Sequence, residues 1–317
     1  MPAVVFAAIT LQQYQVYISS TSTILGAGTD VGLISASGFR DLPPIRQGNA
    51  SRGQRDGALP GLNLLGERTV GVTYQITRTT GTTEAALAAV TAAHQNIIDP
   101  STVCMTAGDY LRQKAGIGAT KPISSGMIQL PNRDNPLIFF GRPVRFNAPI
   151  ETDFQYGRVD IQTEWSCPDG LLYDNSVISG QCGLPNPTSG TRFPATFNLT
   201  FGASSGGSFQ MVNTGAYATP PYFTITGPVA YPIITNATTG QQIRLNIVLG
   251  ATDILGIDCQ SGTITLNGSA NRNNTVGIST TFFHLAPDVN TIGFASSDSV
   301  AVTAQLTGYA LPAYSVA

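Results

Sequence analysis

Strict alternation of apolar and polar residues marks two stretches in the first quarter of the chain. Residues 13–18 (QYQVYI) alternate, and residues 62–77 (LNLLGERTVGVTYQIT) alternate again around Gly66 and Gly71. A period of two places successive side chains on opposite faces of a strand. Both stretches therefore predict β-strands with one buried face.

A segment of low hydrophobicity separates these two strands, from Ser35 to Pro60. Its basic residues are Arg40, Arg46, Arg52 and Arg55. At about 26 residues it far exceeds the usual connection, and such loops are typically functional or disordered. Burial in the chain's own core cannot order a stretch with few apolar residues, so it is either mobile or ordered by a neighbouring subunit. We expect the second, with these four arginines as candidate subunit-interface residues.

Helical periodicity is clear in one place, residues 84–98 (EAALAAVTAAHQNII). Thr82 or Thr83 can cap the first turn, and Pro100 ends the pattern. His94 falls on the apolar stripe with Leu87 and Val90, where a histidine is far more often a core residue than a ligand or base. A second short helix is expected over residues 106–114.

Strand signals return at residues 137–140, 144–146 and 157–165. Residues 166–194 then show no period and are rich in Pro and Gly, as domain boundaries are. Short strands separated by turns follow, and their spacing predicts a β-sandwich. Asn267-Gly268 after an alternating run is a strong hairpin signal. The expected strands are 196–202, 207–213, 221–227, 230–235, 241–249, 254–258, 262–267, 276–286, 290–295 and 299–309.

Composition narrows the function classes. Only 11% of the 317 residues are charged, against roughly 25% in an average soluble domain. The net charge of −2 gives a polyanion no general attraction, so nucleic-acid recognition is not expected. Only two of the 16 basic residues are lysines, Lys114 and Lys121. Since interfaces favour Arg over Lys, this bias fits a contact surface, and it fits a GC-rich genome equally well.

Membrane, export and zinc-site signals are absent from the sequence. No run reaches the roughly 18 to 20 apolar residues that span a bilayer, and residues 3–9 lack the features of a secretory signal. The cysteines, Cys104, Cys167, Cys182 and Cys259, show no CxxC spacing. Cys167 and Cys182 could form a disulfide, but free thiols are favoured for a protein made in a reducing cytoplasm. We expect no metal.

Catalytic motifs are missing as well. The chain contains no GxxxxGK[ST], HExxH or strand-linked GxGxxG pattern, and it has only two histidines. Glu151 with Asp153, or Asp253 with Asp258, could pair in a fold, but 18 acidic residues always offer such pairs. We expect no catalytic residue, no cofactor and no enzymatic activity.

The second half carries an ordered set of motifs. They are 213–215 (NTG), 219–228 (TPPYFTITGP), 232–236 (PIITN), 238–247 (TTGQQIRLNI), 255–258 (LGID), 264–268 (ITLNG) and 282–294 (FFHLAPDVNTIGF). In order and spacing they resemble the galectin-like C-terminal sandwich of siphophage distal tail proteins, which are also known as minor tail or tail-tip proteins. Where that family commonly has Gly before the final Asn turn, this chain has Asp288-Val289 before Asn290.

The first half resembles the belt domain of the same family. The matching motifs are 38–39 (GF), 43–46 (PPIR), 52–57 (RGQRDG), 67–68 (ER), the single helix and 165–170 (WSCPDG). The resemblance implies a mainly β chain, with a belt-like β-barrel domain over 1–180 that has one helix at about 84–98, and a galectin-like antiparallel β-sandwich over 181–317.

The function that the resemblance implies is structural. The protein would form a ring, as a homohexamer, at the virion tail tip, joining the tail tube to the tip or baseplate hub after assembly in the host cytoplasm. Its partners would be copies of itself, the tail tube protein, the hub and other minor tail proteins, with the tape measure protein as a further candidate, and no membrane.

Two other functions fit the sequence. A carbohydrate- or receptor-binding module for host adsorption is the alternative, because galectin-like sandwiches can bind glycans, although fold alone does not establish function. A glycan array separates it from the structural function. A secreted, disulfide-bonded adhesin would need a signal sequence and paired cysteines.

Overall fold

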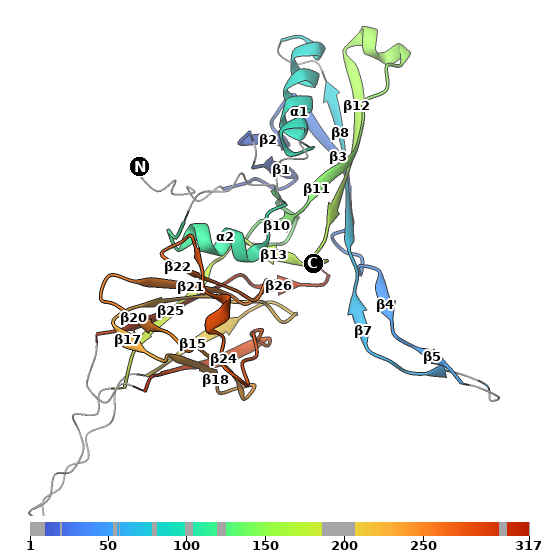
Figure 1. The fold of residues 1–317 in the computed structure, drawn as a ribbon. Coiled ribbons are helices and arrows are strands. Elements are labelled where there is room, and N and C mark those ends of the chain that lie inside the picture. The colour runs from blue at the N-terminus through green and yellow to red at the C-terminus, as the bar shows by residue number, and fades with distance from the viewer. Residues whose placement is uncertain are drawn as a thin grey trace, which may run out of the picture. The chain divides into compact units, whose positions relative to one another are not determined.

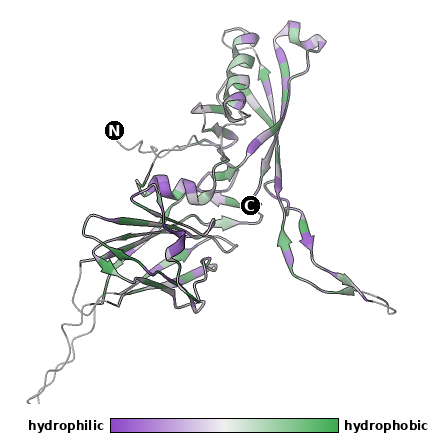
Figure 2. Cartoon of the chain, viewed as in Figure 1, coloured by the Kyte–Doolittle hydropathy of each residue, from purple (hydrophilic) through white to green (hydrophobic). Residues whose placement is uncertain are grey.

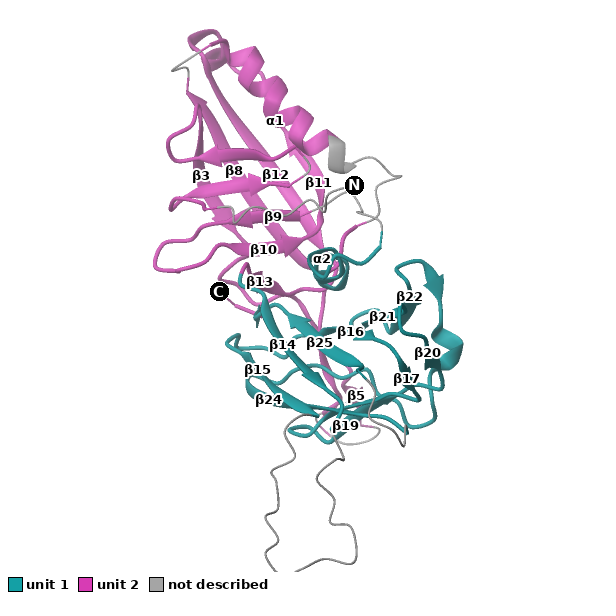
Figure 3. Cartoon of the chain, turned by 90° about the vertical axis from the view of Figure 1, so that its left-hand side faces the viewer, with its two compact units in different colours: residues 1–5, 107–120, 176–313 teal, residues 6–106, 121–175, 314–317 magenta. Residues whose placement is uncertain are grey.

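The computed structural model describes residues 10–19, 21–52, 56, 58–77, 81–98, 104–118, 125–185, 207–297 and 303–316. The chain forms two compact units, coloured in Figure 3. Unit 2 comprises residues 6–106, 121–175 and 314–317, and unit 1 comprises residues 1–5, 107–120 and 176–313. The mainly β fold class expected from the sequence is confirmed (Figure 1).

Unit 2 contains two antiparallel sheets (Figure 1). The six-stranded sheet has the order β2 (Thr23–Gly26), β1 (Gln15–Ile18), β9 (Ser125–Ile128), β10 (Leu137–Phe140), β13 (Leu172–Asp174) and β26 (Ala313–Tyr314). The four-stranded sheet has the order β11 (Arg142–Asn147), β12 (Arg158–Cys167), β8 (Arg68–Thr77) and β3 (Val31–Ser37). A short 3-10 helix, Thr152–Tyr156, lies between β11 and β12.

The core of unit 2 follows the period-two pattern that the sequence shows. Along β8, Val70, Val72, Tyr74 and Ile76 are at most 1% exposed, while the residues between them lie on a more open face. The rings of Phe139 on β10 and Trp165 on β12 meet edge to face at 5.3 Å, which joins the two sheets.

Helix α1 (Thr83–Ile98) contributes the third layer of this core. As predicted, Thr82 caps it, since the Thr82 hydroxyl accepts from the amide of Ala85 at 3.2 Å. His94 is fully buried, as expected, and its Nδ1 lies 2.8 Å from the carbonyl oxygen of Val90.

Unit 1 is a sandwich of two antiparallel sheets. One has the order β14 (Ile178–Gly183), β25 (Gln305–Ala310), β16 (Tyr222–Thr226), β21 (Ile254–Asp258), β22 (Thr263–Leu266) and β23 (Ala270–Asn271). The other has the order β15 (Ser208–Asn213), β24 (Asp288–Ala295), β18 (Ile233–Asn236) and β19 (Gln241–Arg244). A small pair, β17 (Val229–Ala230) with β20 (Val248–Leu249), and a 3-10 turn at Asn273–Thr275 complete the unit.

Most of the strands expected in unit 1 are present at the expected places. The hairpin signal is confirmed, because Asn267 and Gly268 both adopt positive φ, 51° and 77°. The expected strand 276–286 is wrong, since this segment makes only isolated bridges at Val276 and Leu285. Its apolar residues Phe283 and Leu285 are buried, but the segment has no continuous strand pairing. The apolar pattern of the sequence therefore indicated burial and not a strand. The expected strand 196–202 lies outside the described residues.

Unit 1 also includes a helix from the first half of the sequence. Helix α2 (Ala107–Lys114) forms where a second short helix was expected, and it contacts β16 and β21 of the sandwich. The chain therefore has a helix beyond the single one of the expected fold class. The division expected between residues 180 and 181 falls inside β14, which pairs with β25 along its whole length.

The four cysteines are free thiols, and three of them, Cys167, Cys182 and Cys259, are buried. Burial raises the pKa of the Cys182 thiol to about 11 and that of Cys259 well above its usual range. Their protonated forms fill core positions, as free cysteines commonly do.

Candidate functional site: an exposed hairpin arm

The low-hydrophobicity segment is not an irregular loop. Strand β4 (Ile45–Gln47) pairs with β7 (Asn63–Leu65), and β5 (Ala50–Ser51) pairs with β6 (Ala58–Leu59). The two strand pairs follow one another and form an arm of two antiparallel chain segments. The arm connects the end of β3 to the start of β8 (Figure 1). We call residues 44–66 the hairpin arm. The segment, expected as a loop that a neighbouring subunit orders, is a hairpin in its described residues, because its two halves hydrogen-bond to each other. Hydrophobicity does not report such long-range pairing, and ordering by a neighbouring subunit stays a prediction.

The predicted interface arginines lie on this arm or beside it. Arg40 follows β3, Arg46 lies in β4, and Arg52 follows β5; all three are exposed. Arg55 lies outside the described residues. The three described arginines thus belong to one continuous segment that contributes nothing to the core of unit 2.

The arm also exposes large apolar side chains, which the sequence analysis did not single out. The exposed fractions are 45% for Ile45, 53% for Leu59, 82% for Leu62 and 53% for Leu64, and Leu42, just before the arm, is 60% exposed. Figure 2 shows both hydrophobic and hydrophilic residues along the arm. The recurrence of Leu at 59, 62 and 64 is the available signal, but Leu59 falls in the expected loop and Leu62 and Leu64 fall in a strand expected to be half buried.

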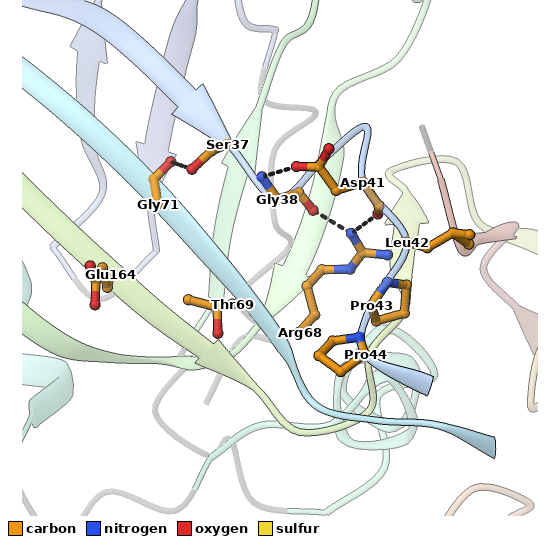
Figure 4. Close-up of a pocket in the computed structure, with 10 residues that line it drawn as sticks. All are labelled: Ser37, Gly38, Asp41, Leu42, Pro43, Pro44, Arg68, Thr69, Gly71 and Glu164. Atoms are coloured by element: carbon orange, nitrogen blue, oxygen red, sulfur yellow. Dashed lines mark hydrogen bonds between the residues drawn. The ribbon is translucent and has the colours of Figure 1, made fainter. Parts of the chain in front are cut away.

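The root of the arm is organised by a buried arginine (Figure 4). Arg68 is only 1% exposed, and its Nη1 donates to the carbonyl oxygens of Gly38 and, at 2.9 Å, of Asp41. Burial lowers the pKa of Arg68, although Cys167, Asp169 and Asp41 oppose this, and a guanidinium stays protonated regardless. The carboxylate of Asp41 accepts from the amide of Gly38 at 3.3 Å.

Two hollows of unit 2 border this root. One, of about 320 Å³, is lined by Asp41, Pro43, Pro44, Arg68 and Glu164 among others (Figure 4). The other, of about 400 Å³, lies against β3 and is lined by Tyr14, Ile34, Phe39 and Leu130 among others. The surface is of mixed polar and apolar character, and Asp41, Arg68 and Glu164 are the charged residues that line the first hollow.

The four-stranded sheet of unit 2 ends in two open edges. Among the described residues, β3 and β11 have no strand partner on their outer sides. Each edge strand has a register shift that exposes a β-branched apolar residue, Ile34 in β3 at 52% and Val144 in β11 at 64%. Open edges with exposed apolar residues are templates for pairing with another chain.

Two further features, a cluster of metal ligands and a membrane-spanning helix, are absent from the described residues. The described part of the chain contains no group of three or more His, Cys, Asp or Glu side chains placed to hold a metal ion. None of its helices is long and apolar enough to cross a membrane.

Comparison with known proteins gives one family and one fold. Residues 214–307 match the family model of the siphovirus-type tail component, C-terminal domain. No curated protein matches the sequence. The Dit protein of phage SPP1, described as a paradigm of the hub adsorption apparatus in phages that infect Gram-positive hosts, has a TM-score of 0.57 at 11% identity. The similarity covers 93% of this chain and 97% of that one.

A chain of the phage P2 baseplate, in its activated conformation with Ca, has a TM-score of 0.50 at 9% identity, over 95% of this chain and 98% of that one. At such identities the likeness shows a shared fold. The predicted resemblance to the siphophage distal tail family is confirmed by the family match together with this fold.

Proposed function

We propose that this protein is a structural component of a phage tail, at the distal end, where copies form a ring that joins the tail tube to the tail-tip or baseplate hub. The observation that carries the proposal is the match of residues 214–307 to the siphovirus tail component, in a chain of which 93% aligns with the fold of SPP1 Dit. The physical arguments for a ring are independent of that match.

The open sheet edges support ring formation. β3 and β11 are different surfaces, so pairing the β3 edge of one copy with the β11 edge of the next is a head-to-tail contact. Such contacts form a closed ring when the rotation between copies divides a full turn, and they form a filament otherwise. A continuous sheet would also satisfy the backbone groups that each edge leaves open. We propose six copies per ring.

The hairpin arm supplies the second contact. Its exposed leucines resemble the apolar core of an interface, and its arginines can bind carboxylates of a neighbouring copy in a bidentate manner. An arm that buries nothing in its own unit gains stability only when another surface covers it. Arg40, Arg46, Arg52 and Arg55 therefore stay our proposed interface residues.

The remaining assignments follow from this role. The proposed partners are the tail tube protein, the tail-tip hub and other minor tail proteins, with the tape measure protein as a further candidate. The sandwich of unit 1 is proposed to be galectin-like. The protein would act without catalysis, in the virion tail, after assembly in the host cytoplasm.

Replacing Arg52 and Arg55 together with Ala tests this function. Arg52 is exposed, and Arg55 follows it in the same low-hydrophobicity stretch of sequence, so the midpoint of thermal unfolding should stay within about 2 °C of the wild type, because surface substitutions away from cores change stability little. Incorporation into tails should fall at least tenfold, measured as the titre of a phage lacking the wild-type gene. Arg158→Ala, an exposed arginine on β12, is the matched control and should complement fully.

Native mass spectrometry of the wild-type protein tests the ring itself, and a species of six copies is expected. Full complementation by the double variant would refute the assembly role of the arm. A wild-type protein that neither associates in solution nor is found in purified tails would refute the structural function.

A further inference from the structure

The side chain of Arg68 connects segments that are far apart in the sequence. Besides its bonds to Gly38 and Asp41, its Nε donates to the carbonyl oxygen of Gly170 at 3.0 Å, and its Nη2 donates to that of Ser315. One buried guanidinium thus joins the arm root, the turn after β12 and residues just after β26. Charge-assisted bonds to carbonyl oxygens are the stronger kind of hydrogen bond, and their loss in a buried place leaves unsatisfied acceptors.

Of residues 313–316, Tyr314 and the two that follow it belong to unit 2. Strand β26 lies at the edge of the six-stranded sheet beside β13. The Arg133 guanidinium lies 4.5 Å from the centre of the Tyr314 ring, and its Nη2 is 3.6 Å from Oδ2 of Asp174, the last residue of β13. These contacts fix the backbone around Tyr314, and with it the Ser315 carbonyl that Arg68 binds.

The side chains of the arm contribute little burial that could stabilise it, among the described residues. All residues of β4, β5 and β6 are exposed, and in β7 only Leu65 is partly covered. A two-stranded ladder without a buried face is at best marginally stable in water. At its base, Gly66 donates to the Pro44 carbonyl at 2.6 Å, and beyond that point the root contacts of Arg68 begin.

We propose that residues 313–316 act as a fastener for the hairpin arm, with Arg68 as the positioning residue that transmits their hold to Gly38 and Asp41. The inference deepens the proposed function, since it says what prepares the arm for a neighbouring copy. Displacement of residues 313–316, by truncation or by a partner that pairs with β13, releases the arm root without unfolding the sheets.

Amide hydrogen exchange on the full-length protein, kept dilute so that it is monomeric, tests the fastener. In Arg68→Met the amides of β4 and β7 should exchange about tenfold faster than in the wild type. Because Arg68→Met leaves buried carbonyls unpaired and can fail to fold, Tyr314→Ala is the second variant. It removes the ring under Arg133 at a position outside the arm, and should also speed exchange in the arm while amides 159–163 of β12 keep the wild-type rate. Arg158→Met is the matched control.

Two results would overturn the fastener. One is arm exchange in Tyr314→Ala equal to that of the wild type. The other is a wild-type arm whose amides already exchange at the unprotected rate, since residues 313–316 would then not stabilise the arm. Ring formation measured in parallel separates the two proposals: faster arm exchange with intact rings keeps the fastener and refutes the assembly role of the arm.

Discussion

At the residue scale, the buried side chain of His94 makes the stability of unit 2 depend on pH. His94 lies among the rings of Phe146, Trp165 and Tyr74, with centroid distances of 5.3, 5.7 and 6.1 Å. Its Nε2 has no hydrogen-bond partner among the described residues. Burial lowers its pKa below 6.5, with the Val90 carbonyl opposing, so the ring is neutral in the folded protein at neutral pH.

A pH dependence of stability follows from this environment. Because the pKa of His94 is lower in the folded state, the unfolded chain binds the proton first as the pH falls below about 6.5, and unfolding becomes easier. His94→Phe keeps an aromatic ring and removes the titration. The free energy of unfolding of the wild type relative to this variant should therefore fall between pH 7 and pH 5, by at most about 1.4 kcal/mol per pH unit.

Urea denaturation of both proteins at several pH values measures this difference. The second histidine, His284, is present in both proteins, so its own lowered pKa cancels from the comparison. A difference that stays constant over this pH range would contradict the assignment of His94 as a buried neutral side chain.

At the element scale, helix α2 belongs to unit 1, although the sequence on both sides of residues 107–120 belongs to unit 2. The amide of Gly108 donates to Oε1 of Gln260 at 3.0 Å, and Arg112 donates to the carbonyl of Gly268. A Cβ at position 108 would lie 2.4 Å from the carboxylate oxygens of Asp258, so only glycine allows this close approach. The carboxylate of Asp258 lies against the first turn, where the helix dipole favours negative charge.

Leu111→Ala tests whether α2 belongs energetically to the sandwich. Leu111 is fully buried, and truncation of a buried leucine costs about 2 to 5 kcal/mol. Hydrogen exchange should become faster in β16 and β21, which α2 contacts, while β8 and β12 keep their rates. Val90→Ala in α1, also fully buried, is the control and should show the reverse pattern. Faster exchange in β8 alone in the Leu111 variant would mean that α2 supports unit 2 instead.

At the scale of the whole molecule, the open edges of the four-stranded sheet govern association with other copies. Ile34 and Val144 stand at the register shifts of the two edge strands, one on each edge. In a head-to-tail pairing, the surface that carries Ile34 meets the surface that carries Val144. An edge is protected from such pairing when it carries a charge, and lysine is the residue that natural edges use most.

Ile34→Lys should therefore prevent ring formation without unfolding the monomer. Since Ile34 is half exposed, we expect the free energy of unfolding to change by less than about 1 kcal/mol. Sedimentation velocity should show only monomer at concentrations at which the wild type associates. Ile278→Lys is the matched control, because Ile278 is 93% exposed and lies outside the strands. Unchanged association of the Ile34 variant would show that this edge is not the contact.

Local patterns in the sequence were sufficient for much of this protein. Period-two alternation identified β1, β8 and β12, and helical spacing with a threonine cap located α1 and the buried position of His94. The positive φ of Asn267 and Gly268 was also readable, because a tight turn restricts residue type locally. Shortly before Asn290, Asp288 adopts a positive φ of 77°.

Only the tertiary structure decided the candidate site. That the arginine-rich segment is a hairpin depends on pairs such as Ile45 with Leu65, and the root depends on bonds from Arg68 to residues 102 and 247 positions away. The docking of α2 on the sandwich is likewise a contact between distant parts of the chain. Hydrophobic periodicity records which side chains are buried, but it carries no record of which distant backbone groups complete a hydrogen bond, and those long-range bonds turn an apparent loop into an arm.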